Sequence, residues 1–197
     1  MSYNINNFYG AAVKYDFARQ FQFCLGQIGT NSFLDTDSLI YVETASLPGK
    51  QINNIPVPYM GLAFNVPGTV SYPGSAGYQV TFRCDADYYI RSRLEQALTN
   101  LFAHETSTGN YGLPGKTSII SFHLFNKKRD IIRTYTLYGV WVQSLADAAY
   151  NIADNGAVVQ IQATLSYQYW EITSNAPRDT EAGSTVGDFN PAPPFPR

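Results

Sequence analysis

Residues 157–170 carry the strictest pattern in the chain, because apolar and polar side chains alternate there one by one. Strict alternation places every second side chain on the same face of a β-strand. The apolar members are Val159, Ile161, Ala163, Leu165, Tyr167 and Tyr169, and the polar members are Gln160, Gln162, Thr164, Ser166 and Gln168. The pattern predicts a strand with one buried face and one polar, uncharged face.

Shorter alternations bounded by Gly and Pro turns predict further antiparallel strands. We expect them at residues 19–25, 38–47, 77–84, 118–125 and 131–142, with a hairpin at residues 51–66. Pro56 and Pro58 cannot donate a hydrogen bond to a sheet. The hairpin is therefore expected at a sheet edge or as a protruding arm.

Between about residues 87 and 102 the spacing changes to that of a helix. The apolar residues there are Ile90, Leu94, Ala97, Leu98, Leu101 and Phe102. Asp85 or Asp87 is placed to cap the helix N-terminus. The fold class predicted is mainly β, an antiparallel sandwich or barrel, with this one helix packed outside the sheets through Ile90, Leu94 and Leu98.

Composition indicates a protein that assembles. The chain has 197 residues, enough for one domain, and only 14% are charged, against about 25% in an ordinary soluble domain. It contains 15 tyrosines, a residue type favoured at interfaces. The net charge of −2 argues against a nucleic-acid binder held by a basic field. We expect no membrane anchor, because no leader and no run of about 18 apolar residues is present.

The residues that could form a catalytic, metal-binding or phosphate-binding site match the motifs for such sites only weakly. We expect no enzyme, no metal and no cofactor. Gly115-Lys116-Thr117 resembles the end of a phosphate-binding loop, but Asn110 stands where that motif needs glycine. His104 and His123 are the only histidines and lie in no metal-binding or catalytic motif. Cys24 and Cys84 form no C-x-x-C pair and are expected to be free thiols.

The chain ends differ from its middle in composition. We divide it into a lead-in of residues 1–15, a β-domain of residues 16–171 and a Pro- and Gly-rich arm of residues 172–197. The tip of this arm contains Pro193, Pro194 and Phe195, which we expect to dock on a neighbouring subunit.

Several short segments, in this order and spacing, resemble the tail tube proteins of contractile-tailed phages of the T-even type. The resemblance covers about residues 16–171. It includes the helix arginines Arg91 and Arg93 and these segments: Asp16-Phe-Ala-Arg19, Phe21-x-Phe23, Ala45-Ser-Leu-Pro-Gly49, Ile55-Pro-Val-Pro-Tyr-Met60, Asn65-Val-Pro-Gly68, Gln79-Val-Thr-Phe82, Tyr138-Gly-Val-Trp141 and Leu165-Ser-Tyr-Gln-Tyr-Trp-Glu171.

The resemblance implies a structural subunit of the virion tail, made in the host cytoplasm. Six copies would form a ring around a lumen, and rings would stack into a tube inside the sheath, starting from a baseplate tube initiator. Genome DNA would pass through without specific binding. Contacts between rings are expected from Ile55, Val57, Tyr59 and Met60 on the hairpin arm. The uncharged row Gln160, Gln162, Thr164, Ser166 and Gln168 suits the lumen wall, or equally a subunit interface.

Three alternatives remain open. The lead-in and the arm look like additions to the family pattern, which leaves a baseplate tube initiator possible. A tube of a phage-like injection system, such as an R-type pyocin or a type VI secretion system, has the same general form. A monomeric β-sandwich binding module with exposed Tyr and Trp is the alternative from a different class.

Overall fold

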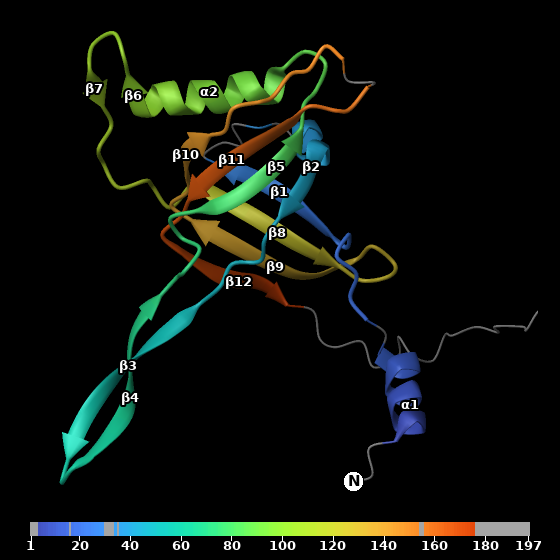
Figure 1. Cartoon of the computed structure of the whole chain (residues 1–197), viewed down its shortest axis with the longest axis vertical. Helices are drawn as coiled ribbons and strands as arrows, with labels where there is room; N and C mark the ends of the chain where they lie inside the picture. The colour runs from blue at the N-terminus through green and yellow to red at the C-terminus, as the bar shows by residue number, and fades with distance from the viewer. Residues whose placement is uncertain (1–3, 16, 30–33, 35, 154–155, 176–197) are drawn as a thin grey trace, which may run out of the picture.

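A computed structural model of the chain describes residues 4–15, 17–29, 34, 36–153 and 156–175. Two four-stranded antiparallel sheets form a sandwich, with a separate two-stranded hairpin and two helices outside it (Figure 1). This confirms the predicted fold class. Within the described residues, no helix is both long enough and apolar enough to span a membrane.

Each sheet draws its strands from distant parts of the sequence. The first sheet has the order β1 (Phe23–Gly29), β8 (Ile119–Phe125), β9 (Ile131–Tyr138) and β12 (Tyr169–Asn175). The second has the order β10 (Trp141–Leu145), β11 (Gln160–Ser166), β5 (Tyr78–Arg83) and β2 (Val42–Ala45). A short ladder of β6 (Phe102–Ala103) and β7 (Thr108–Gly109) follows helix α2.

The core lies between the two sheets and follows the alternation seen in the sequence. In the second sheet, strands β11 and β5 pair three sets of buried residues: Ile161 with Phe82, Ala163 with Val80, and Leu165 with Tyr78. In the first sheet the rings of Phe23 and Phe122 stack with their centroids 5.4 Å apart. Burial of these faces is the main stabilising contribution to the sandwich.

The two long strands predicted at residues 131–142 and 157–170 are each divided in the structure. Gly139 and Val140 separate β9 from β10, and Tyr167 and Gln168 separate β11 from β12. At each break the chain leaves one sheet and enters the other. Gly139 has a φ of 66°, and a Cβ there would lie 2.6 Å from Cγ of Gln168, so glycine is strongly favoured. The prediction of two continuous strands is wrong, because alternation does not indicate which sheet a strand joins.

Two other predicted strands begin later than expected. Residues 19–22 form a turn, in which the side-chain oxygen of Gln22 accepts a hydrogen bond from the Arg19 amide at 2.8 Å, and β1 starts only at Phe23. Residues 38–41 belong to a 3₁₀ helix, η1 (Thr36–Tyr41), that precedes β2. At residues 19–22, this local hydrogen bond of a polar side chain with the backbone competes with strand formation.

Helix α2 (Tyr89–Leu101) lies within the predicted range and packs against β10 outside the sheets. The Asp85 carboxylate caps it by accepting hydrogen bonds from the backbone amides of Tyr89 at 2.9 Å and Ile90 at 3.2 Å. Ile90 and Leu94 are buried and Leu98 is half-buried, as predicted.

Helix α1 (Ile5–Tyr15) was not predicted. Its N-terminus is capped by Asn4, whose side-chain oxygen accepts a hydrogen bond from the backbone amide of Asn7 at 2.9 Å. At the other end of the chain β12 continues to Asn175, past the expected end of the β-domain at residue 171. The predicted docking residues Pro193, Pro194 and Phe195 lie outside the described residues.

Truncating the Leu94 side chain tests how much the packing of α2 on the sandwich contributes to stability. Leu94 is 0% exposed, so Leu94→Ala leaves a cavity and should lower the free energy of unfolding by about 2–5 kcal/mol. Urea denaturation measures this loss. Leu113, which is 82% exposed, is the matched control, and Leu113→Ala should change the free energy by less than about 0.5 kcal/mol. Equal losses in the two variants would contradict the packing of α2.

Candidate assembly surfaces

Two side chains with catalytic potential, Cys24 of β1 and His123 of β8, are cross-strand partners in the first sheet. Nδ1 of His123 is 2.9 Å from the Thr134 hydroxyl, and burial lowers the pKa of His123. Cys24 and Cys84 are free thiols, as expected. Among the described residues, no three His, Cys, Asp or Glu side chains come close enough to hold a metal ion. The absence of enzymatic activity stays a prediction.

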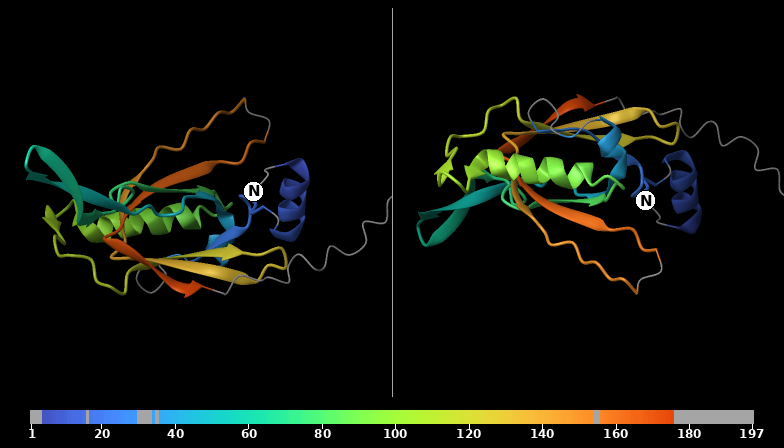
Figure 2. Two further views of the ribbon diagram at one scale, coloured as in Figure 1. Left: turned by 90° about the horizontal axis from the view of Figure 1, so that it is seen from below. Right: turned by 90° about the horizontal axis from the view of Figure 1, so that it is seen from above.

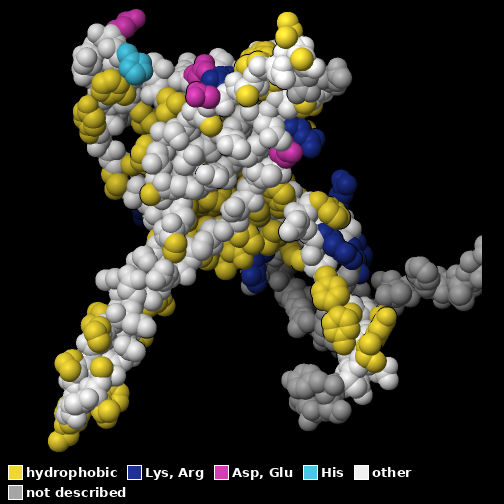
Figure 3. Space-filling view, in the orientation of Figure 1, with side chains coloured by type: hydrophobic (Ala, Val, Ile, Leu, Met, Phe, Trp, Pro, Cys, Tyr) yellow, Lys and Arg dark blue, Asp and Glu magenta, His cyan; other side chains and the backbone are white. Residues whose placement is uncertain are grey.

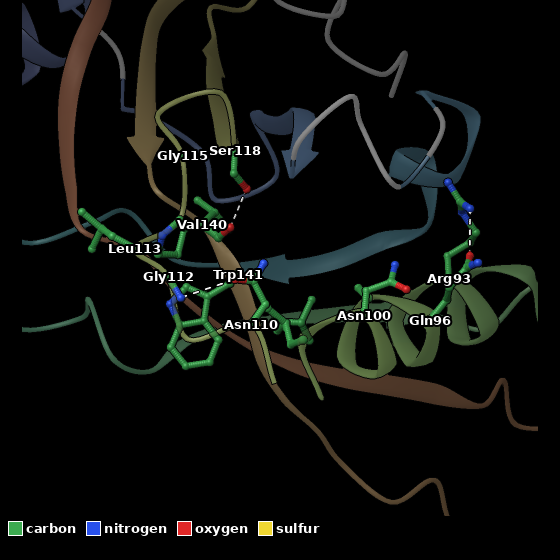
Figure 4. A pocket seen from close by; sticks show the side chains of 14 residues that line it. Arg93, Gln96, Asn100, Asn110, Gly112, Leu113, Gly115, Ser118, Val140 and Trp141 are labelled. Carbon is green, nitrogen blue, oxygen red and sulfur yellow. Dashed lines mark hydrogen bonds between the residues drawn. The ribbon is translucent and has the colours of Figure 1, made fainter. Parts of the chain in front are cut away.

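A cleft of about 510 Å³ lies between α2 and the loop that leads into β8 (Figure 4). Arg93 is the only charged residue in its lining, and its guanidinium donates to the side-chain oxygen of Gln96 at 3.0 Å. At the opposite end of the cleft the Ser118 hydroxyl donates to the Val140 carbonyl. The lining contains no carboxylate and no histidine, so it offers no pair of groups for general acid–base chemistry.

The hairpin of β3 (Gln51–Tyr59) and β4 (Leu62–Ser71) projects from the sandwich as a separate sheet (Figures 1 and 2). Its tip is a two-residue turn in which Met60 and Gly61 have φ angles of 47° and 80°. Two positive φ angles are typical of a type I′ turn, whose twist matches that of the paired strands. The prediction of a protruding arm agrees with this arrangement.

The two faces of the hairpin differ. The cross-strand pairs Ile55–Val66, Val57–Phe64 and Tyr59–Leu62 share one face, and all six side chains are exposed. We call these six residues the hairpin face. The opposite face carries Asn54, Pro56, Pro58, Ala63, Asn65 and Pro67. No residue from 51 to 71 is charged.

The exposed apolar residues of the hairpin are typical of a surface that binds a partner. Apolar side chains gather visibly on the projecting hairpin (Figure 3). A two-stranded hairpin is only marginally stable in water, and contiguous exposed apolar patches mark interaction sites. Three of the four predicted contact residues, Ile55, Val57 and Tyr59, lie on the hairpin face, while Met60 lies in the turn and is 86% exposed.

The five predicted lumen residues differ in their exposure and in their position along the chain. Gln160 and Gln162 are exposed and Thr164 is half-buried on the outer face of β11. Ser166 is buried, and its hydroxyl donates to the Ser75 carbonyl at 2.9 Å. Gln168 is exposed but lies between β11 and β12. The structure thus brings three of the five onto one solvent-facing row.

Strand β5 widens this row into a polar sheet face. Its residues Gln79, Thr81 and Arg83 pair with Thr164, Gln162 and Gln160 of β11. The Arg83 guanidinium lies 3.8 Å from the carboxylate of Glu43 in β2, and the same carboxylate accepts a hydrogen bond from Gln160 at 2.9 Å. We call Gln79, Thr81, Arg83, Glu43, Gln160, Gln162 and Thr164 the polar face. Its positive and negative charges balance.

No protein-family model and no curated protein sequence matches the chain. Solved structures do match. A chain of the anti-feeding prophage (AFP) baseplate aligns with a TM-score of 0.57 and 12% identity, covering 80% of this chain and 96% of its own. A chain of the AFP tube-terminating cap has a TM-score of 0.54 and 14% identity, covering 80% and 91%.

A chain of the sheath–tube complex of PVC, an extracellular contractile injection system, aligns with a TM-score of 0.53 and 12% identity. The alignment covers 88% of this chain and 99% of the PVC chain. At such identities the likeness establishes the fold alone. The alignments cover more than nine tenths of each of these neighbours, and their sources are the tube, cap and baseplate of contractile injection systems.

We predict that the hairpin face drives association between copies. Replacing Val57 and Tyr59 by Asp places two charges on this face without touching the core of the sandwich. The double variant should keep the thermal unfolding midpoint of the sandwich, measured by circular dichroism, and should lose the large assemblies that sedimentation velocity detects. The matched control, Asn54→Asp with Asn65→Asp, puts the same charges on the opposite face and should assemble normally. Normal assembly of the first variant would contradict the prediction.

Proposed function

We propose that this chain is the tail tube subunit of a contractile-tailed, T-even-type bacteriophage. Six copies form a ring, rings stack into a hollow tube inside the sheath, and genome DNA passes through the lumen into the host. The exposed, charge-free hairpin face is the observation that carries this proposal, because it gives each copy an apolar surface that its own fold leaves uncovered.

Ring formation is supported by the edges of the second sheet. Strands β10 and β2 are its outermost strands, so each presents one side to which another strand can pair. An open sheet edge favours association with another chain, and closure of a sheet into a barrel removes such edges. In a ring, the β10 edge of one copy joins the β2 edge of the next. The polar faces of the six copies then line the lumen.

A neutral lumen suits the passage of DNA. A Lys or Arg that neutralises a phosphate releases counterions and adds affinity, which would retain the DNA. On the polar face the one arginine, Arg83, already faces Glu43 at 3.8 Å, and the remaining side chains are amides and hydroxyls. Gln160, Gln162 and Thr164 are the lumen residues of this proposal. Ser166, which is buried within its own subunit, is not part of the wall.

Partners follow from the same proposal. The neighbours in the PVC sheath–tube complex and the AFP baseplate support a sheath outside the tube and a baseplate protein on which the tube begins. The likeness to the AFP baseplate chain and the presence of α1 outside the sandwich favour a second candidate, the baseplate tube initiator itself. A tube subunit polymerises without limit, whereas an initiator forms a single ring.

Assembly state tests the proposal directly. The subunit has a mass of 21.9 kDa, so mass photometry at micromolar concentration should find particles of six or more subunits. Negative-stain microscopy should show six-fold rings and hollow tubes of variable length. Single rings without tubes would favour the initiator. A monomer at every concentration would overturn both and favour a monomeric binding module.

A further inference from the structure

Helix α1 exposes a second apolar surface, on the other side of the sandwich from the hairpin. Five of its apolar residues, Ile5, Phe8, Tyr9, Ala12 and Val13, recur at i, i+3, i+4, i+7 and i+8 and so share one helix face. The four large ones are exposed by more than half of their surface. The ring of Phe17, also exposed, lies 6.2 Å from that of Phe8 and extends the patch.

This helix needs a partner to be stable. It has 11 residues, and isolated helices shorter than about 12–15 residues are marginal in water even with favourable sequences. Its sequence includes Asn6, Asn7 and Gly10, which are poor helix formers. The usual source of helix stability is packing of the apolar face on another apolar surface.

The position of α1 restricts what that surface is. Figure 2 shows α1 and the hairpin on opposite sides of the sandwich, and in Figure 1 both lie below the sheets but well apart, so α1 lies away from the hairpin face of its own chain. A lipid surface is disfavoured by charge: helices that bind membranes carry a Lys- and Arg-rich polar face, whereas Lys14 is the only basic residue of α1.

The hairpin face of a second copy has the matching size and chemistry. The α1 stripe runs from Ile5 to Val13, about 12 Å at 1.5 Å per residue. The hairpin face runs from Ile55 to Tyr59, about 13 Å along the strand. Neither surface carries a charge, so joining them buries apolar side chains without desolvating an ion.

We propose that α1 of one copy packs on the hairpin face of a second copy. This inference rests on the proposed function, and it names α1 as the surface that the hairpin face contacts in the assembly. The contact joins two different patches of the same chain, so it is heterologous and repeats from copy to copy, as a ring or a stack of rings requires. Phe8, in the middle of the stripe, comes to lie over Val57 and Phe64, the middle pair of the hairpin face.

Disulfide trapping between two full-length variants tests the contact. Both carry Cys24→Ser and Cys84→Ser; one adds Phe8→Cys, and the other adds Phe64→Cys and a tag that changes its mass. The mixture is oxidised and the mixed dimer is quantified on a non-reducing gel. The matched control replaces Phe64→Cys by Ala63→Cys, on the opposite face of the same strand. Because a disulfide needs Cβ atoms about 4 Å apart, we expect roughly tenfold more mixed dimer with the first pair.

Microscopy of the same mixtures before oxidation separates this inference from the proposed function. Rings or tubes with no excess of the Phe8→Cys and Phe64→Cys dimer over the control would overturn the inference and leave the tube proposal standing. Monomers without a mixed dimer would overturn both. A second variant, Phe8→Asp, should keep the unfolding midpoint of the sandwich and reduce assembly, and unchanged assembly would also overturn the inference.

Discussion

The close approach of Gly139 to Gln168 is the constraint on which the sandwich depends. Here β9 passes into β10 and β11 passes into β12, so two chain segments change sheets at one corner. At this corner the backbone amide of Gln168 donates a hydrogen bond to the Tyr138 carbonyl at 2.9 Å. A side chain at residue 139 would collide with Gln168 and would resist the positive φ. The corner fixes which faces of four strands meet in the core, and thereby sends the polar face of β11 outward.

The sequence predicts what depends on local periodicity. Alternation correctly indicated the buried residues Ile161, Ala163 and Leu165, and helical spacing indicated Ile90 and Leu94. The corner was missed because a strand that changes sheets keeps its alternation; the only signal was Gly139, an isolated glycine inside a strand pattern. Helix α1 was missed because its stripe lies among asparagines and covers no part of its own sandwich. The burial of Ser166 depends on Ser75, a contact far away in sequence.

Two exposed apolar surfaces, the predicted hairpin face and the unpredicted α1 stripe, bear on assembly. A helix that packs on its own domain has its apolar stripe covered, but the stripe of α1 and the hairpin face remain exposed in the single chain. The hydrophobic effect makes such exposure unfavourable, in proportion to the apolar area left in water. In the proposed contact these two surfaces, which lie on opposite sides of one molecule, would cover each other when copies join.

The hairpin face, which would hold the proposed tube together, and the polar face, which DNA would pass, differ in their charged residues. The hairpin face has no charge, so association through it is not weakened by the ionic screening that affects ion pairs. Salts excluded from protein surfaces strengthen such burial. On the polar face, Glu43 lies beside Arg83 and accepts a hydrogen bond from Gln160, so a carboxylate would already oppose the arginine in the proposed lumen. In the proposed tube, the residues that would hold the assembly together and those that would face DNA thus lie on different strands.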